Sequence, residues 1–415
     1  MVHQTSSSSS TSAPRASSKS KIMNQLLSRI SRCIASAAIV GMLWSCASAP
    51  PYSAEGAAGI AATAPGVLPG DTGPLPPALQ HGKSRWVPVR WADLPGFADD
   101  KLFEAWNAWI KSCERPGPTF AALCGDVRRL SIGTGDERRA WMMQRLQPYR
   151  VEPLTGSAGS SEGLLTGYYE PLLDASRLPA PGYGVPLYRP PAGLNQRRPW
   201  YTRQQIDTLP EAQAALRGHE IAYLADPIDA LILQIQGSGR LRITEPDGSQ
   251  HLVRLSFAGT NDQPYQSVGR WLLDQGATRD ATWPGIRAWL AQNPRRVNEL
   301  LWSNPRVVFF REEPLSPLDA AFGPRGAQGV ALTPGRSIAV DATSIPYGTP
   351  VWLASSGPLV KLDRLVLAQD TGTAIVGAVR ADYFAGSGPA AGELAGRLKQ
   401  PLRLWVLWPK QVLTQ

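Results

Sequence analysis

The stretch from Ser337 to Gly386 contains three apolar runs that each carry an aspartate: SIAVD (337–341), VLAQDTG (366–372) and VRADYFAG (379–386). Their β-branched and aliphatic residues are typical of strands. The expected strands, separated by turns rich in Gly and Pro, cover 336–340, 349–353, 365–368, 375–380 and 402–407. Short strands at this spacing predict a small β-barrel, with Asp341, Asp370 and Asp382 presented at strand ends on its rim.

Aspartates that converge on one cleft repel one another, so the pKa of at least one of them should rise. A carboxylic acid that keeps its proton near neutral pH is the group that cleavage of a glycosidic bond requires. A rival interpretation comes from Asp370-Thr371-Gly372, which is also the signature triplet of aspartic peptidases. In that class two aspartates share one proton, so a single-barrel chain needs a homodimer and a two-lobed chain needs a second triplet, which we do not expect in this sequence.

The N-terminal segment has the pattern of an export signal. Residues 1–22 are rich in Ser, Thr, Ala and Lys, and Met23 is an alternative start. The apolar run 33–44 is about 12 residues long, which suits a signal peptide and is too short to span a bilayer. It ends in LWSC (43–46), which resembles a bacterial lipobox and makes Cys46 the candidate lipidation site. Ordinary signal cleavage near 47–49 is the alternative.

This pattern predicts residues 1–45 as a pre-sequence and residues 46–85, rich in Ala, Pro and Gly, as a flexible tether. We therefore expect a lipid-anchored protein on the periplasmic side of the outer membrane, with a soluble periplasmic protein as the alternative. Residues 1–45 hold five basic and no acidic residues, so without them the net charge of +9 falls to +4. Such a mild charge argues against a nucleic-acid partner and suits a substrate that carries carboxylates.

Cys113 and Cys124 would lie in an oxidising compartment after export, where they are candidates for a structural disulfide; two buried thiols are the alternative. The chain has no CxxC or HExxH pattern, and its four histidines are scattered, so we expect neither a metal nor a cofactor.

The folded body, 86–408, is long for one domain and suggests two. Asp100 is the expected cap of a helix that reaches Cys113. The runs 231–236 and 240–243 flank a Gly-rich turn and are interpreted as a β-hairpin. Further expected elements are a helix at 136–146, a strand at 251–255 and helices at 265–275, 284–291 and 294–302.

Several motifs, in order, resemble the membrane-bound lytic murein transglycosylase A family: LLTGYYEP (164–171), LILQIQGSGRLR (231–242), NPRRVNELLWSNPRVVFFRE (293–312) and the three-aspartate region. The C-terminal part resembles a 3D domain. The resemblance covers 86–408 and implies a mainly β fold with α (α+β). A double-psi β-barrel would be built from 86–171 and 323–412, with a smaller β-barrel-like domain, 172–322, inserted and a glycan groove between them.

The resemblance also implies a reaction. The family cleaves the β-1,4 bond between N-acetylmuramic acid and N-acetylglucosamine in peptidoglycan without water and forms a 1,6-anhydro end. It implies Asp382 as the acid/base and Asp370 as its catalytic neighbour. The family suggests an exotransglycosylase, although the residues do not choose between chain ends and internal bonds.

The resemblance further suggests substrate-binding residues, each with a structural alternative. Tyr168 and Glu170 match a motif near the groove. However, Tyr168 and Tyr169 point to opposite faces of a strand, so only one of them can face the groove. Asp341 matches the first family aspartate and is equally suited to cap a turn. The remaining candidates are Gln236, Gly237, Ser238, Thr371 and Gly372. The implied partners are the glycan strand, the outer membrane and other cell-wall proteins. The alternative to an enzyme is a non-catalytic peptidoglycan-binding lipoprotein.

Overall fold

The computed structural model describes residues 71–154 and 161–410, all within one compact unit, Pro65–Gln415. The expected pre-sequence, Cys46 and most of the expected tether lie outside the described residues. In the part of the chain that is described, no helix combines the length and the apolar character needed to cross a membrane.

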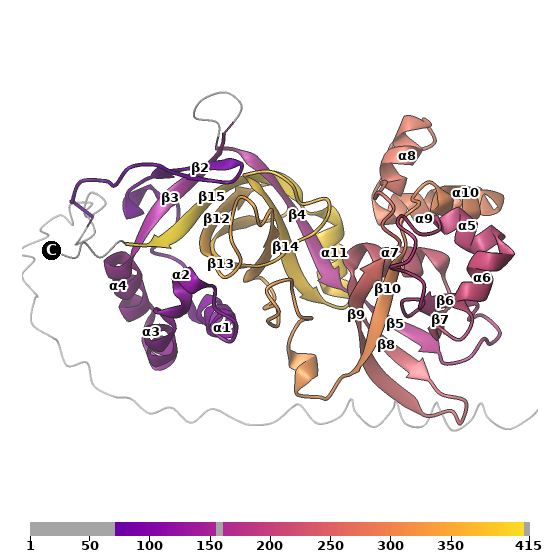
Figure 1. Cartoon of the computed structure of the whole chain (residues 1–415). Helices are drawn as coiled ribbons and strands as arrows, with labels where there is room; N and C mark the ends of the chain where they lie inside the picture. Colours follow the sequence, from indigo (N-terminus) through magenta and orange to yellow (C-terminus); the bar gives the residue numbers. More distant parts are fainter. Residues whose placement is uncertain (1–70, 155–160, 411–415) are drawn as a thin grey trace, which may run out of the picture. The chain divides into compact units, whose positions relative to one another are not determined.

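Nine strands form the larger sheet, in the order β1-β2-β3-β15-β12-β13-β11-β14-β4. They are β1 (Leu79–His81), β2 (Ser84–Pro88), β3 (Leu146–Pro153), β4 (Gly163–Glu170), β11 (Ser337–Val340), β12 (Pro350–Ser356), β13 (Lys361–Asp370), β14 (Arg380–Ser387) and β15 (Lys399–Pro409). Because β15 also pairs with β4, six of these strands close into a ring. Figure 1 shows β4, in magenta, beside the C-terminal strands with which it pairs.

The interior of this ring is an apolar core. Val351, Leu353, Val366, Leu404 and Val406 are all buried there. Alternation along each strand sends these side chains inward and their neighbours outward. The expected α+β fold with a barrel-like sheet is therefore confirmed, while the double-psi crossing remains an expectation.

Four α-helices precede β3 and pack against one side of the barrel: α1 (Phe103–Ser112), α2 (Pro118–Ala121), α3 (Cys124–Arg129) and α4 (Gly135–Arg145). Trp106, Trp109 and Trp141 are buried together with Trp352 of β12 and Trp405 of β15. These tryptophans are therefore core residues. Cys113 and Cys124 are joined in a disulfide, with their Cα atoms 5.5 Å apart.

Asp100 does not cap the first helix as expected. The residue before α1 is Leu102, in a left-handed conformation with φ 62°, and its backbone N–H donates to Asp100 at 3.1 Å. The carboxylate of Asp100 instead forms two hydrogen bonds with Arg336, at 2.6 and 2.9 Å. The local pattern predicted the side chain of Asp100 as a helix cap, but this side chain forms a long-range ion pair with Arg336 instead.

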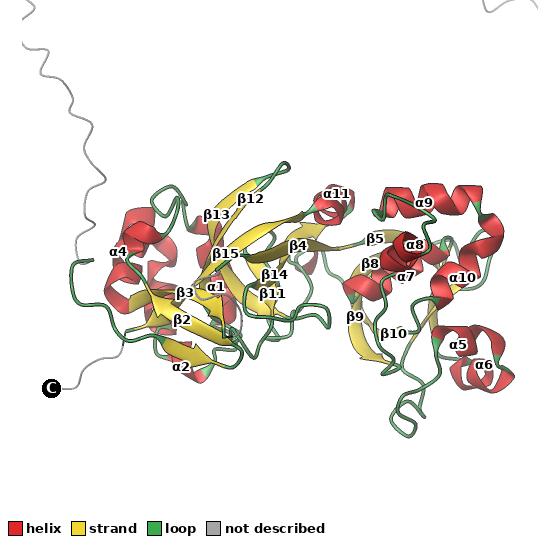
Figure 2. Ribbon diagram, turned by 90° about the horizontal axis from the view of Figure 1, so that it is seen from above, coloured by secondary structure: helices red, strands yellow, loops and turns green. Residues whose placement is uncertain are grey.

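The chain between β4 and β11 forms a second sheet of six strands, in the order β10-β9-β8-β5-β7-β6. These strands are β5 (Leu172–Ser176), β6 (Val185–Tyr188), β7 (Glu220–Leu224), β8 (Ser238–Thr244), β9 (Gln250–Thr260) and β10 (Val308–Pro314). Figure 2 shows the helices of this segment beside the sheet: α5 (Arg203–Thr208), α6 (Pro210–Leu216), α7 (Pro227–Gln236), α8 (Val268–Asp274), α9 (Trp283–Gln292) and α10 (Val297–Trp302).

One more helix, α11 (Pro389–Arg397), lies between β14 and β15, and four short 3-10 helices complete the described elements: η1 (Trp91–Asp93), η2 (Leu130–Ile132), η3 (Pro294–Arg296) and η4 (Asp319–Ala321). The six-stranded sheet is inserted in the chain between β4 and β11 of the nine-stranded sheet, and both sheets lie in the same compact unit. The expected domain limits at 172 and 322 therefore remain a prediction.

The expected hairpin at 231–243 is wrong, because its first half belongs to helix α7. Asp226 caps this helix by accepting a hydrogen bond from the N–H of Ile228 at 2.7 Å, and Pro227 occupies the first turn. Gly237, with φ 78°, ends it in the left-handed region that glycine adopts without strain. The helix start and stop signals therefore outweigh the strand-like composition of this run, and the run forms a helix.

The expected strand at 375–380 is also wrong. This segment forms turns, with Gly377 at φ 117°, and the strand begins only at Arg380. Asp382 is therefore the third residue of β14 and lies within a strand. Asp370 ends β13, and Asp341 directly follows β11.

Candidate functional site

Two of the three aspartates lie in one row across four adjacent strands. Ala339 of β11 pairs with Asp370 of β13 on one side and with Asp382 of β14 on the other. Asp382 in turn pairs with Thr166 of β4. Residues that pair directly across a sheet project from the same face. We call Asp370, Ala339, Asp382 and Thr166 the carboxylate row.

The carboxylate row lies on the outer face of the barrel. Ile338 and Val340, on either side of Ala339, are part of the buried interior core, as are Ala381 and Tyr383 on either side of Asp382. Since neighbours along a strand point to opposite faces, the row points away from that core.

Asp382 is held by one side chain. The hydroxyl of Thr166 donates a hydrogen bond to its Oδ1 atom and accepts one from Arg380 Nη2 at 2.8 Å. Burial raises the pKa of Asp382, while the hydrogen bond from Thr166 and the charge of Arg380 act in the opposite direction. Within the described residues, Oδ2 of Asp382 has no hydrogen-bond partner. This oxygen is therefore available to carry a proton to a ligand.

Asp370 is held more tightly. Its Oδ2 atom accepts the hydroxyl of Tyr168 at 2.9 Å, and its Oδ1 atom accepts the backbone N–H groups of Ala327 and Thr371, both at 2.9 Å. Burial raises the pKa of Asp370, and the negative charge of Asp382 raises it further against those hydrogen bonds. Burial and the two carboxylates also raise the pKa of Tyr168 well above its ordinary value, so its hydroxyl remains a donor.

The two aspartates thus form a coupled pair in which ionisation of one opposes ionisation of the other. Burial raises the pKa of both aspartates, so pKa alone does not select Asp382 as the acid. Hydrogen bonding does distinguish them. Both oxygens of Asp370 are engaged by the protein, whereas Asp382 has one free oxygen.

Asp341 lies outside the carboxylate row and fits the structural interpretation. Its Oδ1 atom accepts the N–H and the hydroxyl of Thr343 at 3.0 and 2.6 Å, and its Oδ2 atom accepts the N–H of Gly377 at 2.9 Å. Although burial opposes ionisation, these bonds and Lys83 lower the pKa of Asp341. These contacts support the alternative in which this carboxylate holds two turns together, and the expected substrate contact stays a prediction.

Glu170 also requires a correction. Its side chain is 0% exposed and accepts hydrogen bonds from Arg240 and Arg254, each at 2.7 Å. A buried carboxylate with both oxygens occupied does not meet a sugar. The expected substrate-binding role of Glu170 is therefore replaced below by a different one.

The other expected substrate-binding residues are dispersed. The side-chain oxygen of Gln236 accepts the N–H of Tyr169 at 3.0 Å, Gly237 ends α7 and Ser238 begins β8. The hydroxyl of Thr371 donates to the carbonyl of Val340 at 3.0 Å. Binding of N-acetyl groups by 236–238, and of substrate by Thr371 and Gly372, remains a prediction.

Thr166 and Arg380 are site residues that the sequence analysis did not identify. Thr166 lies two residues before Tyr168 on β4, and the period of two places both side chains on one face. That signal was present in the motif LLTGYYEP. The partner of Thr166 depends on the pairing of β4 with β14, which joins residues 216 positions apart.

The second peptidase-like triplet that a two-lobed enzyme needs does exist, at Asp71-Thr72-Gly73. However, Asp71 accepts the N–H of Ala92 at 3.2 Å and is not part of the carboxylate row. The structure therefore does not bring the two triplets into one site. Among the described residues, no group of three His, Cys, Asp or Glu side chains is arranged to hold a metal ion.

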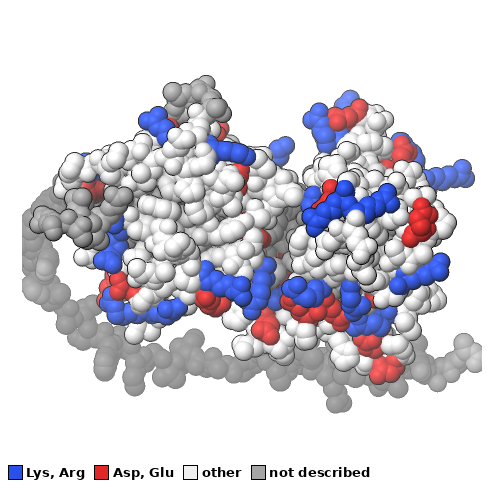
Figure 3. All heavy atoms as spheres, in the orientation of Figure 1, with Lys and Arg blue, Asp and Glu red and all other residues white. Residues whose placement is uncertain are grey.

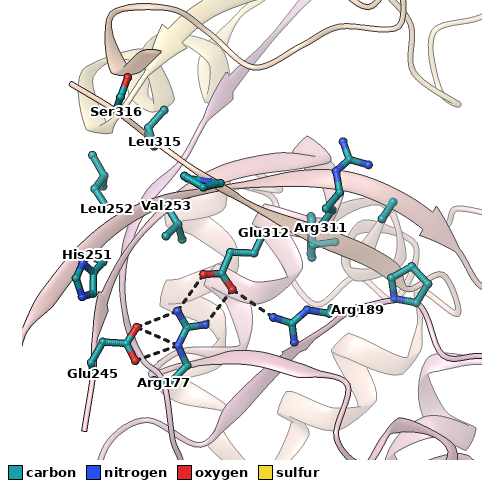
Figure 4. Close-up of a pocket in the computed structure, with 14 residues that line it drawn as sticks. Arg177, Arg189, Glu245, His251, Leu252, Val253, Arg311, Glu312, Leu315 and Ser316 are labelled. Atoms are coloured by element: carbon teal, nitrogen blue, oxygen red, sulfur yellow. Dashed lines mark hydrogen bonds and ion pairs between the residues drawn. The ribbon is translucent and has the colours of Figure 1, made fainter. Parts of the chain in front are cut away.

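A cavity of about 880 Å³ lies in the six-stranded part, and no residue of the carboxylate row lines it. Figure 4 shows Arg177 bridging Glu245 and Glu312, and all three residues line the cavity. Arg177 also donates to the carbonyl of Ile221, so its donors are used within the protein. Arg189 also pairs with Glu312, so two arginines balance two glutamates in this network. On the face drawn in Figure 3, Lys and Arg lie among Asp and Glu without forming a continuous basic surface.

Comparison with known proteins adds independent findings. Residues 164–311 match the model of the MltA specific insert domain, and residues 336–408 match that of the 3D domain. A membrane-bound lytic murein transglycosylase A from Vibrio cholerae is 30% identical over 304 residues, 68% of this chain and 76% of the relative.

Two solved structures are also similar. Lytic transglycosylase LtgG of Burkholderia pseudomallei is 44% identical, with 81% of this chain and 98% of that chain covered and a TM-score of 0.55. Escherichia coli MltA with bound chitohexaose is 25% identical, with coverage of 80% and 94% and a TM-score of 0.61.

The barrel-like fold, the paired carboxylates and these matches place the chain in the class of lytic transglycosylases. Within that class, it belongs to the membrane-bound lytic murein transglycosylase A family.

Proposed function

We propose that this protein cleaves the β-1,4 bond between N-acetylmuramic acid and N-acetylglucosamine in peptidoglycan, with Asp382 as the sole acid and base. The observation that carries the proposal is the free Oδ2 atom of Asp382, next to an engaged and coupled carboxylate on the outer face of the barrel. Family membership supports the substrate class, and the Escherichia coli relative was solved with a chitohexaose, a β-1,4-linked amino-sugar oligomer.

In the proposed reaction, protonated Asp382 gives its proton to the glycosidic oxygen as the bond to C1 breaks. The resulting carboxylate then accepts the proton of the C6 hydroxyl, whose oxygen forms a new bond to C1. The product is a 1,6-anhydro ring, and the acid ends the cycle protonated. Because the nucleophile belongs to the sugar, one carboxyl group suffices, in contrast to the two carboxylates of ordinary glycosidases.

The surroundings of Asp382 suit both halves of this cycle. Burial favours the neutral acid that must donate first, since a carboxylate is poorly solvated there. Thr166 and Arg380 then stabilise the carboxylate after the proton has left. Asp370, fixed by Tyr168 and two backbone N–H groups, opposes early ionisation of the pair.

We further propose that the mature protein is anchored through a lipid on Cys46 to the periplasmic face of the outer membrane. The names of the family relatives include "membrane-bound", which supports a place in the cell envelope. The part of the expected tether that precedes β1 would let the enzyme reach the glycan strands, acting from chain ends, alone or with other cell-wall proteins.

The test is digestion of purified sacculi, with the products analysed by mass spectrometry. The wild type should release muropeptides with anhydro ends, which are lighter by one water than reducing ends. Asp382→Asn should lose about 10²- to 10⁴-fold in turnover while keeping its fold and its binding to sacculi.

Asp341→Asn is the matched control, because it makes the same change at an aspartate outside the carboxylate row. Near-normal turnover by Asp382→Asn, or reducing ends as the only products of the wild type, would contradict the proposal. Sacculus binding without any soluble product from the wild type would favour the non-catalytic alternative, and pepstatin-sensitive peptide cleavage would favour a peptidase.

A further inference from the structure

Glu170 lies where the chain leaves the larger sheet. It is the last residue of β4, and Pro171 leads directly into β5 of the six-stranded sheet. Its carboxylate is completely buried. Since burial of an unpaired charge is strongly unfavourable, the partners of this carboxylate must explain its position.

Those partners come from both sheets. The Oε1 atom of Glu170 accepts Arg254 Nε at 2.7 Å, and its Oε2 atom accepts Arg240 Nε at 2.7 Å and the hydroxyl of Ser387 at 2.6 Å. Both arginines also donate through Nη2 to the carbonyl of Phe322, at 3.0 and 2.7 Å. One carboxylate thus joins β4, β8, β9, the end of β14 and the connection that returns from the six-stranded sheet.

The same two strands of the barrel carry the site. On β4, the period of two places Glu170 on the face that also presents Thr166 and Tyr168. On β14, Asp382 lies near the start and Ser387 at the end. The backbone N–H of Gly388 also donates to the carbonyl of Glu170 at 2.9 Å. The cluster therefore fixes the C-terminal ends of the strands that position the acid and its supports.

We propose that Glu170, Arg240 and Arg254 form a positioning cluster that holds the six-stranded sheet in register with the strands of the carboxylate row, and so sets the affinity for a polymeric glycan. This inference rests on the proposed function. Glu170 is completely buried and, among the described residues, makes no hydrogen bond to Asp382, so its effect falls on substrate capture and not on proton transfer.

The test is Glu170→Gln in the full chain, assayed on soluble glycan strands freed of peptides. The amide keeps the shape but loses the charge that both guanidinium groups require. We expect KM to rise by roughly fivefold or more, with kcat changed by less than about twofold. The upper limb of the pH profile should not move, because the contacts of Asp382 are unchanged. Co-sedimentation with sacculi, in an Asp382→Asn background, should show the same loss of affinity without relying on turnover.

Glu312→Gln is the matched control. Glu312 pairs with Arg177 and Arg189 within the six-stranded part and, in the part of the chain that the structure describes, has no hydrogen bond to β4 or β14. Its KM and binding should equal those of the wild type. If Glu170→Gln fails to fold, Ser387→Ala removes only the hydroxyl bond, and it should raise KM in the same direction by roughly twofold to threefold.

Equal KM and sacculus binding for the Glu170→Gln and Glu312→Gln variants would overturn the inference. A shift of the pH profile at constant KM would also overturn it, because Glu170 would then act on the acid. Failure of the proposed function is a separate outcome: the wild type would release no anhydro products, while sedimentation would still report the effect of Glu170 on binding.

Discussion

Thr166 connects the charge of Arg380 to the carboxylate of Asp382. A hydroxyl has one hydrogen to donate and lone pairs that accept. Because Arg380 Nη2 donates to this hydroxyl at 2.8 Å, the hydrogen of Thr166 is directed to Asp382. The arrangement favours the ionised form of Asp382 and limits the rise in its pKa that burial causes.

Replacement of Thr166 tests this connection. Thr166→Val keeps the shape and removes the donor, so the pKa of Asp382 should rise. The acid must be protonated to act, and activity falls as pH increases through that pKa. The upper limb of the kcat–pH profile should therefore move to higher pH. Since a hydrogen bond to a charged group contributes about 1.5–3 kcal/mol, kcat should also fall by about 10- to 100-fold.

Thr166→Ser is the control. Because it keeps the hydroxyl, the upper limb of its kcat–pH profile should lie at the same pH as in the wild type. Superimposable pH profiles for the valine and serine variants would show that the hydroxyl does not tune Asp382. Thr166→Val should stay folded, because its side chain differs from threonine by one methyl group in place of a hydroxyl.

At the scale of single residues, the sequence indicated Asp370 and Asp382 because each follows or interrupts an apolar run. It did not distinguish them, since the difference lies in hydrogen bonds from Tyr168 and from the N–H of Ala327, which is 43 positions from Asp370. The substrate role expected for Glu170 failed for the same reason. Its arginine partners lie 70 and 84 positions away, and no local pattern specifies them.

Among the structural elements, α1 is attached to the barrel by a buried ion pair. Asp100, just before α1, accepts two hydrogen bonds from Arg336, just before β11, and one from the N–H of Leu365 in β13 at 2.8 Å. The side chains are 3% and 7% exposed. Burial opposes ionisation of Asp100, but Arg336 and the backbone donors outweigh it and lower the pKa below 3.8.

Asp100→Asn should therefore be strongly destabilising, because Arg336 would remain buried without its main partner. We expect a loss of about 3–5 kcal/mol in the free energy of unfolding by urea at pH 7. The contribution of Asp100 is present above the pKa of the unfolded state and is lost as pH falls through the lower pKa of the folded state. The stability of the variant should accordingly depend less on pH below about 4.

Asp136→Asn is a suitable comparison for that experiment. Asp136 also pairs with an arginine, Arg139, but its side chain is 96% exposed. A pair of this kind contributes about 0–1 kcal/mol. Equal losses for the two variants would show that the Asp100 pair does not anchor the helix.

The elements themselves were predicted where local signals agreed. Thr134 and Glu137 form the capping box of α4, and a helix was expected at 136–146. The errors occurred where β-branched composition competed with turn geometry. At 231–236, the cap by Asp226 and the left-handed Gly237 favour a helix, and at 375–380 Gly377 interrupts the expected strand.

For the whole molecule, the spacing of short strands predicted a small β-barrel, whereas the inserted segment was predicted only through the family resemblance. The ring closes by pairing β4 with β14 and β15, over separations of more than 200 residues. Alternating patterns show that a segment is a strand, but they do not state its partner. The carboxylate row exists only because this pairing aligns Thr166 with Asp382.

The cellular location of the whole molecule is also predicted, and this prediction concerns Cys46. If this cysteine carries the lipid, the mature wild type should sediment with outer membranes, since each buried CH₂ of an acyl chain contributes about 0.8 kcal/mol. Cys46→Ala should appear in the soluble periplasmic fraction. Its kcat on soluble glycan strands should change by less than about twofold, because the part of the expected tether that precedes β1 separates Cys46 from the carboxylate row. Mass spectrometry of the mature N-terminus provides the decisive measurement: a lipid-modified Cys46 supports the anchor, whereas an unmodified N-terminus at Pro50, after Ala-Ser-Ala, would establish simple signal cleavage and a soluble enzyme.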